Sequence, residues 1–334
     1  MPNLALVIFI SFVALIFDFV NGMNDAANSI ATVVSTRVLN PKLAVAWAAL
    51  FNFLAAFFFG VHVATTIGKG IIDPSNVTQI VILSGLLGAI IWSYLCTHFG
   101  LPISVSHALI GGFIGAAIIK NGIGALIMPG IIKVAIFIFV APILGFIIGI
   151  FFMNIVFILF KNASPLRVDG WFRRLQLVSA AAYSLSHGSN DAQKTMGIIA
   201  ILLYTSGYLG PTFYVPLWLI LACHTAIALG TLSGGWAVVN TMGSKITKLK
   251  PVTGFCAEAA GALTIFGASF AGIPVSTTHT ITGSIMGVGA THKASSVHWG
   301  VAGEILWAWI LTIPVSAFFS TIFYILIRAI FKVA

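Results

Sequence analysis

Four stretches of the chain are too long and too apolar to belong to a soluble domain. They are residues 42–67, 77–99, 124–160 and 299–331. An α-helix crosses the hydrocarbon layer of a membrane in about 20 residues, so each stretch is long enough to span it, whereas a membrane β-barrel would show alternating segments of about 10 residues. Only 7% of the 334 residues are charged, against about a quarter in soluble domains. We therefore predict an all-α polytopic membrane protein.

Two motifs occur twice, in the same order and at nearly the same separation. GMNDA at 22–26 returns as GSNDA at 188–192, and GLPISVSH at 100–107 returns as GIPVSTTH at 272–279. The length of chain between the two copies is almost the same for both motifs. Such self-similarity indicates an internal repeat. We predict two repeats and a linker, at residues 1–160, 175–334 and 161–174.

The distribution of basic residues predicts an orientation. The linker 161–174 carries four basic residues, and loop 35–42 carries Arg37 and Lys42, so both are placed in the cytoplasm. The counterpart of that loop, 205–212, has no basic residue and is placed outside. Equivalent loops thus lie on opposite sides, which predicts inverted-topology repeats, as in many secondary transporters, with both termini outside. The net charge of +9, held mostly in short loops, suits an anionic membrane leaflet better than nucleic acid.

Each half is predicted to contain the same elements. These are a helix broken at the Asn-Asp motif, a long span, a pair of helices meeting at the Pro-Ser motif, and a final long helix. This gives roughly 10–12 transmembrane segments in total. The helix pair could be a re-entrant hairpin or two full spans, and its length leaves both open.

Most acidic residues lie where a charge is costly. Of the seven in the chain, five lie in apolar stretches: Asp18, Asp25, Asp191, Glu258 and Glu304. A charge at mid-membrane costs about 2.5–3.5 kcal/mol on insertion scales, so such residues are functional candidates. The alternative is a neutral or paired carboxyl that joins helices. Asp25 and Asp191 occupy equivalent positions in the two repeats, which favours function, whereas for Asp18 and Glu304 both interpretations stay open.

The Asn-Asp motifs are typical of a cation site. Glycine and asparagine tolerate unwound backbone, which inside a membrane is found only where it is buried in protein or lines a watery cavity. Free carbonyls, carboxylates and amide oxygens are the ligands of hard cations. The predicted Na⁺ ligands are Asn21, Asp25, Asn28, Asp191 and Glu258.

The Pro-Ser motifs are typical of an anion site. Proline favours the first turn of a helix and serine or threonine caps it, so each motif predicts a helix start inside the apolar zone. A helix start offers unpaired N–H groups and a positive dipole end. Two facing starts could surround one tetrahedral oxyanion. The alternative is two ordinary kinked helices whose hydroxyls bond to their own backbone.

The histidines next to these serines do not indicate an enzyme. Neighbouring helical residues point apart, so Ser106 and His107 cannot form a nucleophile–base pair. Ser104 could reach His107, but no third, orienting acid is in the sequence. We predict His107, His187 and His279 as accessory residues that orient a helix start, bond a carbonyl or contact the anion.

With these motifs in place, the chain resembles the inorganic phosphate transporter (PiT) family. The family's marks are Gly-x-Asn-Asp-x-x-Asn near the N-terminus, His-Gly-x-Asn-Asp opening the second half, and Pro-x-Ser-x-x-His in each half. The matching stretches here are GMNDAANS, HGSNDAQK, PISVSHALIG and PVSTTHTITG. The resemblance covers nearly the whole chain. The large soluble loop of some relatives is missing, which implies a prokaryotic-type member.

The resemblance implies roles for individual residues. Asp25 and Asp191 match the motif aspartates implicated in coupling, and Glu258 matches an acidic position of the family. Some relatives carry a glutamate in the second helix of the first half, where this chain has Asn52. Lys194, in the second Asn-Asp motif, could balance Asp191 or contact the anion. The candidate phosphate ligands are Asn24, Ser104, Val105, Ser106, Asn190, Gln193, Ser276, Thr277 and Thr278.

The function implied is cation-coupled symport of inorganic phosphate across the cytoplasmic membrane by alternating access. The oxygen-rich motifs favour Na⁺ as the coupling ion, and the histidines keep H⁺ open. Sulfate is an alternative substrate, and a passive anion channel is a third possibility, although a channel has no need of buried aspartates. We expect no cofactor and no enzymatic activity, and we expect a homodimer.

Overall fold

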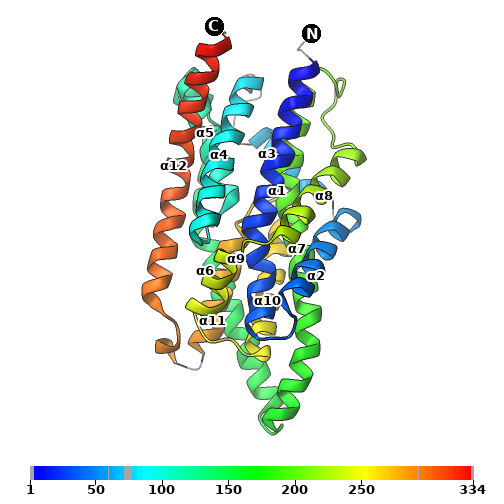
Figure 1. Cartoon of the computed structure of the whole chain (residues 1–334), viewed down its shortest axis with the longest axis vertical. Coiled ribbons are helices and arrows are strands. Elements are labelled where there is room, and N and C mark those ends of the chain that lie inside the picture. Colours follow the sequence, from blue (N-terminus) through cyan, green and yellow to red (C-terminus); the bar gives the residue numbers. More distant parts are fainter. Residues whose placement is uncertain (1–3, 59, 71–76, 292, 332–334) are drawn as a thin grey trace.

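The protein is built from helices. The computed structural model describes residues 4–58, 60–70, 77–291 and 293–331. The α-helices in this part are α1 (Leu4–Ser35), α2 (Pro41–Leu54), α3 (His62–Gly70), α4 (Gln79–Phe99), α5 (Val105–Asn121), α6 (Met128–Phe160), α7 (Pro165–Thr205), α8 (Leu217–Ser233), α9 (Trp236–Asn240), α10 (Pro251–Phe270), α11 (Thr277–Ala290) and α12 (Trp299–Phe331). Figure 1 shows them as a bundle elongated along one axis. The predicted all-α fold is confirmed.

Several of these helices can cross a membrane by length and composition. Within the described residues, α1, α4, α6, α10 and α12 do so alone, and the bent pairs α2–α3 and α8–α9 raise the number to seven. The helix α7 is 41 residues long but less apolar, because it carries much of the polar site. The sequence predicts roughly 10–12 transmembrane segments, and by length and composition the described residues contain five to seven full-length apolar spans.

One face of α6 has the character of a lipid-facing surface. Ile136, Phe139, Ile143 and Ile147, spaced three or four residues apart, are all exposed. Residues with this spacing share one side of a helix. A soluble protein would rarely leave so continuous an apolar stripe uncovered. The stripe supports a membrane-embedded bundle.

The predicted breaks at the Asn-Asp motifs are wrong. Both α1 and α7 continue through their motifs as regular helix. Position 22 requires glycine, because a Cβ there would come within 3.0 Å of the Ile227 carbonyl on α8. A Cβ on Gly188 would lie 2.6 Å from the Asn52 carbonyl on α2. The glycines therefore serve close helix packing rather than unwinding, and the helices that do bend are the pairs α2–α3 and α8–α9.

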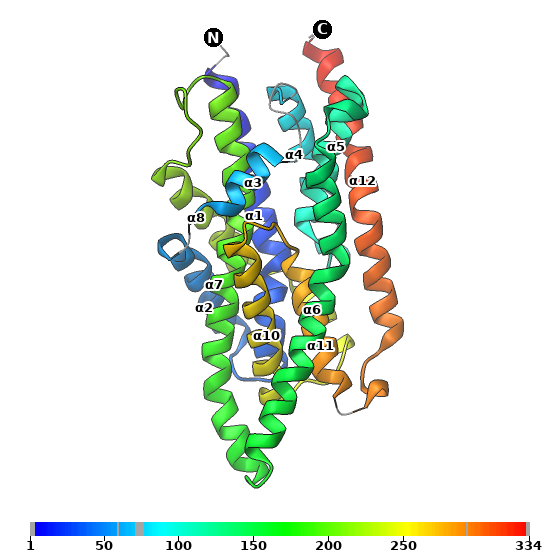
Figure 2. The ribbon, with the colours of Figure 1, turned by 180° about the vertical axis from the view of Figure 1, so that it is seen from behind.

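The predicted helix starts at the Pro-Ser motifs are confirmed. α5 begins after Ser104, whose Oγ accepts from the backbone N–H of His107 at 3.2 Å. α11 begins after Ser276, whose Oγ accepts from His279 N–H, also at 3.2 Å. Both starts are buried in the middle of the bundle (Figure 2). α4 and α5 form a hairpin that opens towards one end of the molecule, and α10 and α11 form a hairpin that opens towards the other end.

The second helix of each hairpin packs against the last helix of the other half of the chain. A Cβ on Gly111 or Gly115 of α5 would come within 3.0 Å of backbone oxygens of α12, at the end of the second half. Gly283 and Gly287 of α11 approach α6, at the end of the first half, just as closely. Small residues let helix backbones approach in this way in membranes. The two halves are therefore interlocked rather than laid side by side.

The helices that carry the two copies of each motif run in opposite directions. In Figure 1, α1 runs from top to bottom and α7 from bottom to top, and the hairpin α4–α5 points down while α10–α11 points up. The first residue of α1 and the last of α12 lie at one end, and the connection between α6 and α7 lies at the other (Figures 1 and 2). Residues 165–174 of the predicted linker form the first turns of α7.

Candidate functional site

Two helices present polar side chains to one another in the centre of the bundle. Five polar residues follow one another at intervals of three or four along α1 and just past its end, so they lie on one side of this helix. They are Asn21, Asp25, Asn28, Thr32 and Thr36. All five are buried. α7 carries its own buried polar face at the same depth. A charge there is stable only with partners, so the contacts of each side chain matter.

The two motif aspartates lie on either side of one histidine. His187 Nε2 lies 3.7 Å from Asp25 Oδ2 and 3.5 Å from Asp191 Oδ2. The other ring nitrogen, Nδ1, lies 3.0 Å from Asn52 Oδ1, while Asn52 Nδ2 donates to Thr231 Oγ1. This arrangement assigns the proton to Nδ1 and turns Nε2 towards the carboxylates. One ligand atom from each of the three residues lies within 4.8 Å of the others, a geometry that can hold a cation.

Lys194 closes the other side of this cluster. Its ammonium donates to Asp191 Oδ1 at 2.5 Å, to Ser106 Oγ at 2.5 Å and to the Val275 carbonyl at 2.8 Å. The side chain is almost fully buried. Since Ser106 lies at the start of α5 and Val275 just before α11, the lysine joins both helix starts to α7.

The start of α11 completes the cluster with two hydroxyls. Thr278 Oγ1 donates to Asp25 Oδ1 at 3.1 Å and accepts from Asn28 Nδ2 at 2.9 Å. Thr277 Oγ1 lies 3.4 Å from Asp25 Oδ2 and 3.3 Å from Asp191 Oδ2. Tyr183 of α7 donates to the Thr277 carbonyl at 3.1 Å and so fixes this helix start.

The two helix starts face one another across the site. The rings of His107 and His279 have centroids 4.8 Å apart, and His279 also stacks on Trp309 at 3.7 Å. The serine caps satisfy the N–H groups of these two histidines, but the first N–H groups of α5 and α11 have no acceptor within their own helices. The N–H groups of Val105 and Thr277 are of the kind that a helix start offers to an anion.

The asparagines of the two motifs make equivalent contacts. Asn24 Nδ2 donates to Thr97 Oγ1 of α4 at 2.7 Å, and Asn190 Nδ2 donates to Ser269 Oγ of α10 at 2.9 Å. Thr97 and Ser269 are themselves equivalent positions of the repeat, because each precedes the proline of its Pro-Ser motif by the same length of chain. The repeat seen in the sequence thus extends to side-chain contacts.

Comparison with known proteins identifies the family to which this site belongs. The model of the phosphate transporter family matches residues 21–320. The chain belongs to the phosphate transporter family. It is therefore a transporter and not an enzyme, and the predicted resemblance is confirmed.

Individual relatives of the family align over nearly the whole chain. A protein of Rhizobium meliloti (strain 1021), described as "Probable low-affinity inorganic phosphate transporter", is 58% identical over 93% of each chain. A protein of Bacillus subtilis (strain 168) with the same description is 45% identical over 98% of this chain and 99% of its own. A solved structure described as "The sodium-dependent phosphate transporter" superposes with a TM-score of 0.90, covering 98% of this chain and 100% of its own, at 26% identity.

In this member of the phosphate transporter family, hydrogen bonds and short polar contacts connect many of the predicted ligands into one cluster. The predicted residues in it are Asp25, Asn28, Ser106, His187, Asp191, Thr277 and Thr278. Asn21 lies on the same face of α1, and its Oδ1 is buried with no hydrogen-bond partner in the described part of the chain. Asp18 is buried one turn further along that face, whereas Glu304 is exposed at the start of α12.

Other predicted ligands have structural partners. Ser104 and Ser276 cap their helices, and Asn24 and Asn190 anchor neighbouring helices. Gln193 accepts from the backbone N–H groups of Val63 and Ala64 and donates to the carbonyls of Gly60 and Ser189, so it holds the start of α3 against α7.

Sequence reasoning did not include three residues of the site among its ligands. Lys194 stood three residues after Asp191, a spacing that places both on one side of a helix, and this signal was available. Asn52 lies on α2, distant in sequence from His187, and Tyr183 lies on α7 one turn before His187 but contacts the distant Thr277. These contacts depend on how α2 and α11 pack against α7.

Glu258 lies in a second buried cluster. It accepts from Thr32 Oγ1 at 2.5 Å, from Gln176 Nε2 at 3.0 Å and from Ser179 Oγ. Gln176 in turn accepts from Thr36 Oγ1 at 2.9 Å. Thr36 lines a cavity of about 780 Å³ at the end of the molecule that carries the α6–α7 connection. Polar groups thus extend from Asp25 along α1 to this cavity.

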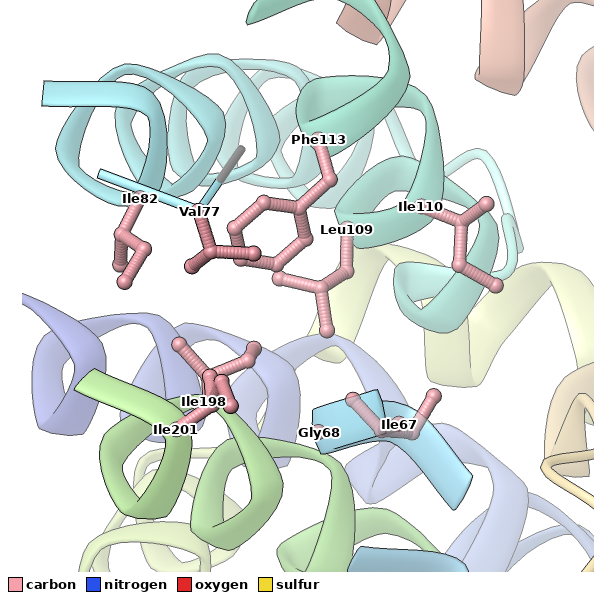
Figure 3. Close-up of a pocket in the computed structure, with 9 residues that line it drawn as sticks. All are labelled: Ile67, Gly68, Val77, Ile82, Leu109, Ile110, Phe113, Ile198 and Ile201. Carbon is pink, nitrogen blue, oxygen red and sulfur yellow. The ribbon is translucent and has the colours of Figure 1, made fainter. Parts of the chain in front are cut away.

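A smaller cavity on the other side of the site is apolar. It measures about 30 Å³ and is lined by residues that include Leu109, Phe113 and Ile198 (Figure 3). These residues follow the site along α5 and α7, towards the end that carries the chain termini. The lining offers no charged or hydrogen-bonding side chain for an ion. Apolar packing therefore separates the site from that end.

Replacing Glu258 by glutamine should reduce phosphate uptake about tenfold without loss of the folded protein. The amide keeps the shape but removes the charge that three donors stabilise, and a charge-assisted hydrogen bond contributes about 1.5–3 kcal/mol. Initial uptake rates in proteoliposomes, normalised to reconstituted protein, measure the effect. Glu304→Gln, at an exposed position, serves as the matched control. Wild-type rates for Glu258→Gln would exclude a role for this carboxylate in transport.

Proposed function

We propose that the protein is a Na⁺-coupled symporter of inorganic phosphate that works by alternating access. The observation that supports this most directly is the juxtaposition of two buried carboxylates, Asp25 and Asp191, with two facing helix starts. The family, and the sodium-dependent phosphate transporter whose fold this chain shares, point the same way.

The phosphate is proposed to bind between the starts of α5 and α11. The N–H groups of Val105 and Thr277 and the hydroxyl of Ser106 supply donors, and the positive dipole ends favour an anion. The nearby Asp25 and Asp191 carboxylates also favour phosphate over sulfate. Phosphate carries a proton near neutral pH and can donate a hydrogen bond to a carboxylate, whereas sulfate cannot.

The cation is proposed to bind at the carboxylates. Asp25 Oδ and Asn28 Oδ1 offer hard oxygen ligands of the kind Na⁺ prefers. The Oδ1 atom of Asn28 is buried with no hydrogen-bond partner in the described residues, so it is free to coordinate. The Nε2 atom of His187 adds a further ligand at the edge of this set.

Coupling follows from the electrostatics of a buried site. Phosphate alone would place its negative charge beside two carboxylates in a medium of low dielectric constant, where unpaired charges cost several kcal/mol. A cation alone would leave the helix starts without their anion. Each ion therefore lowers the free energy of binding of the other, and the empty or fully loaded protein is the form that reorients.

Alternating access is proposed to use an inverted-topology repeat. The opposite directions of corresponding helices support the inversion, and transporters of this kind bind substrate at the repeat interface. The cavity beyond Glu258, which is lined in part by Thr36, and the apolar packing around Leu109 support a conformation open towards the α6–α7 connection. Basic residues of the linker 161–174 support a cytoplasmic location for that end, with the protein in the cytoplasmic membrane.

Reconstitution tests the coupling ion. An inward Na⁺ gradient at constant pH should drive accumulation of ³³P-phosphate above equilibrium, and an inward proton gradient in Na⁺-free medium should not. Accumulation with the proton gradient alone would assign coupling to H⁺. Arsenate should compete with the label and a tenfold excess of sulfate should not. Uptake that never exceeds equilibrium under any gradient would instead indicate a channel.

A further inference from the structure

Lys194 occupies a special place in the internal repeat. It follows Asp191 at the same spacing at which Asn28 follows Asp25, so it is the counterpart of Asn28 in the second repeat. Ser106, which accepts a hydrogen bond from Lys194, likewise corresponds to Thr278, because each is the residue before the histidine of its Pro-Ser motif. The contact from Lys194 to Ser106 is therefore the counterpart of the contact from Asn28 to Thr278, and the site consists of two related half-sites.

The first half-site consists of oxygen atoms around a fixed positive charge. The Lys194 ammonium has three N–H donors, and it has three acceptors at 2.5, 2.5 and 2.8 Å on Asp191, Ser106 and Val275. No donor is left for a phosphate oxygen. A carboxylate, a hydroxyl and a backbone carbonyl are also the ligands that a hard metal cation would take.

The second half-site has corresponding oxygen atoms without a charge among them. The Asp25 carboxylate accepts from Thr278 Oγ1, and Asn28 stands in place of the lysine. Asn28 Oδ1 is buried, only 1% of the residue is exposed, and the atom has no hydrogen-bond partner in the described part. An orphaned buried acceptor beside a buried carboxylate is the arrangement expected of a cation site.

We propose that the Lys194 ammonium is a tethered cation that permanently fills one of two equivalent cation positions. The second position, formed by Asp25, Asn28 and Thr278, is the one left for a mobile coupling ion. This inference rests on the proposed cation coupling and specifies it. A tethered charge offsets Asp191 but cannot cross the membrane, so the transporter moves one cation fewer per phosphate than a chain with asparagine at position 194.

The charges in the cluster agree with this assignment. Asp25 and Asp191 carry two negative charges, and Lys194 offsets one of them. One mobile monovalent cation then balances the remaining carboxylate before the anion binds. With asparagine at position 194, two mobile cations would be needed to reach the same balance.

The variant Lys194→Asn tests the proposal by ion counting. It should transport phosphate only at raised Na⁺ concentration, and the ²²Na⁺ to ³³P-phosphate ratio should rise by one relative to wild type. The Hill coefficient for Na⁺ should rise with it. Lys133→Asn, which removes an exposed lysine of α6, is the control and should leave the ratio unchanged. An active Lys194→Asn protein with the wild-type ratio would overturn the inference.

Two further variants keep the test decisive if Lys194→Asn does not transport. In detergent, Lys194→Asn should bind one more ²²Na⁺ than wild type, and equal binding would also refute the proposal. If that protein does not fold, Asn28→Lys, which fills the second position with an ammonium, should abolish ²²Na⁺ binding at this site. Retained binding there would refute the proposal. Lys194→Met, which supplies neither charge nor oxygen, should stay inactive at every Na⁺ concentration, and wild-type transport by it would again refute the inference.

The outcomes separate this inference from the proposed function. Wild-type uptake that is indifferent to Na⁺ contradicts Na⁺ coupling itself. Wild-type uptake that depends on Na⁺, with an unchanged ion ratio in Lys194→Asn, contradicts only the role given to the lysine.

Discussion

Replacing Asp25 by asparagine should abolish Na⁺-driven phosphate accumulation while the protein still inserts into the membrane. Of the two motif aspartates, Asp25 is the one without an ammonium partner among the described residues, so its charge is the one left for a mobile cation. If the contact between the Asp25 carboxylate and the cation is worth one buried charge-assisted hydrogen bond, removing the charge weakens cation binding by about 3 kcal/mol. At about 1.4 kcal/mol per factor of ten, uptake should fall at least about 100-fold.

The measurement is concentrative uptake in proteoliposomes, with insertion checked by size-exclusion chromatography of the purified protein. Asp169→Asn is the matched control, because Asp169 forms an exposed ion pair with Arg173 at 2.8 Å. Such surface pairs contribute about 0–1 kcal/mol, so this variant should behave as wild type. Normal accumulation by Asp25→Asn would remove the carboxylate from the mechanism.

Asp191→Asn should be inactive for a different reason. It leaves the Lys194 ammonium buried without its carboxylate, and breaking a buried pair in this way costs about 3–5 kcal/mol. We therefore expect loss of thermal stability as well as of transport. Asp25→Asn should lose transport alone, and this contrast separates the two aspartates despite their equivalent positions.

Replacing Gly22 by alanine should remove most of the folded protein. The new methyl group would come within 3.0 Å of the Ile227 carbonyl on α8, which is backbone and cannot move aside as a side chain can. Overpacking a well-packed core costs about 1–3 kcal/mol and occasionally more. Because α1 carries Asp25 on the next turn, the shift would also displace the site.

Thermal unfolding of the purified protein measures this effect, and Gly303→Ala provides the matched control. Gly303 lies in α12, and a Cβ there meets no atom within 4 Å. Alanine should be neutral or stabilising at that position, by up to about 1 kcal/mol, because it favours helix. Equal stability of Gly22→Ala and Gly303→Ala would show that α1 and α8 can separate without cost.

Patterns of local sequence predicted the helix starts correctly. Proline followed by serine at 102–104 and 274–276 specifies a capped first turn, and both starts are present with their caps. The same reasoning was wrong at Gly22 and Gly188. Glycine permits both unwinding and close approach, and only the position of α8 and α2 decides between them.

Contacts between helices that are distant in sequence could not be predicted from the sequence. Tyr183 and Asn52 contact the site through packing between helices, and a single sequence contains no record of that packing. Glu258 was grouped with the aspartates because all are acids in apolar stretches. The structure gives it a separate set of donors on α1 and α7, closer to the 780 Å³ cavity.

The interlocked hairpins have a consequence for biosynthesis. Ser316 and Ser320 of α12 donate to the carbonyls of Ala108 and Gly112 on α5, so α5 obtains its neighbour only when the last helix has left the ribosome. Until then the first hairpin lacks this packing partner. A nascent chain that stops before residue 299 should therefore expose the glycine face of α5 to lipid and become a substrate for membrane quality control.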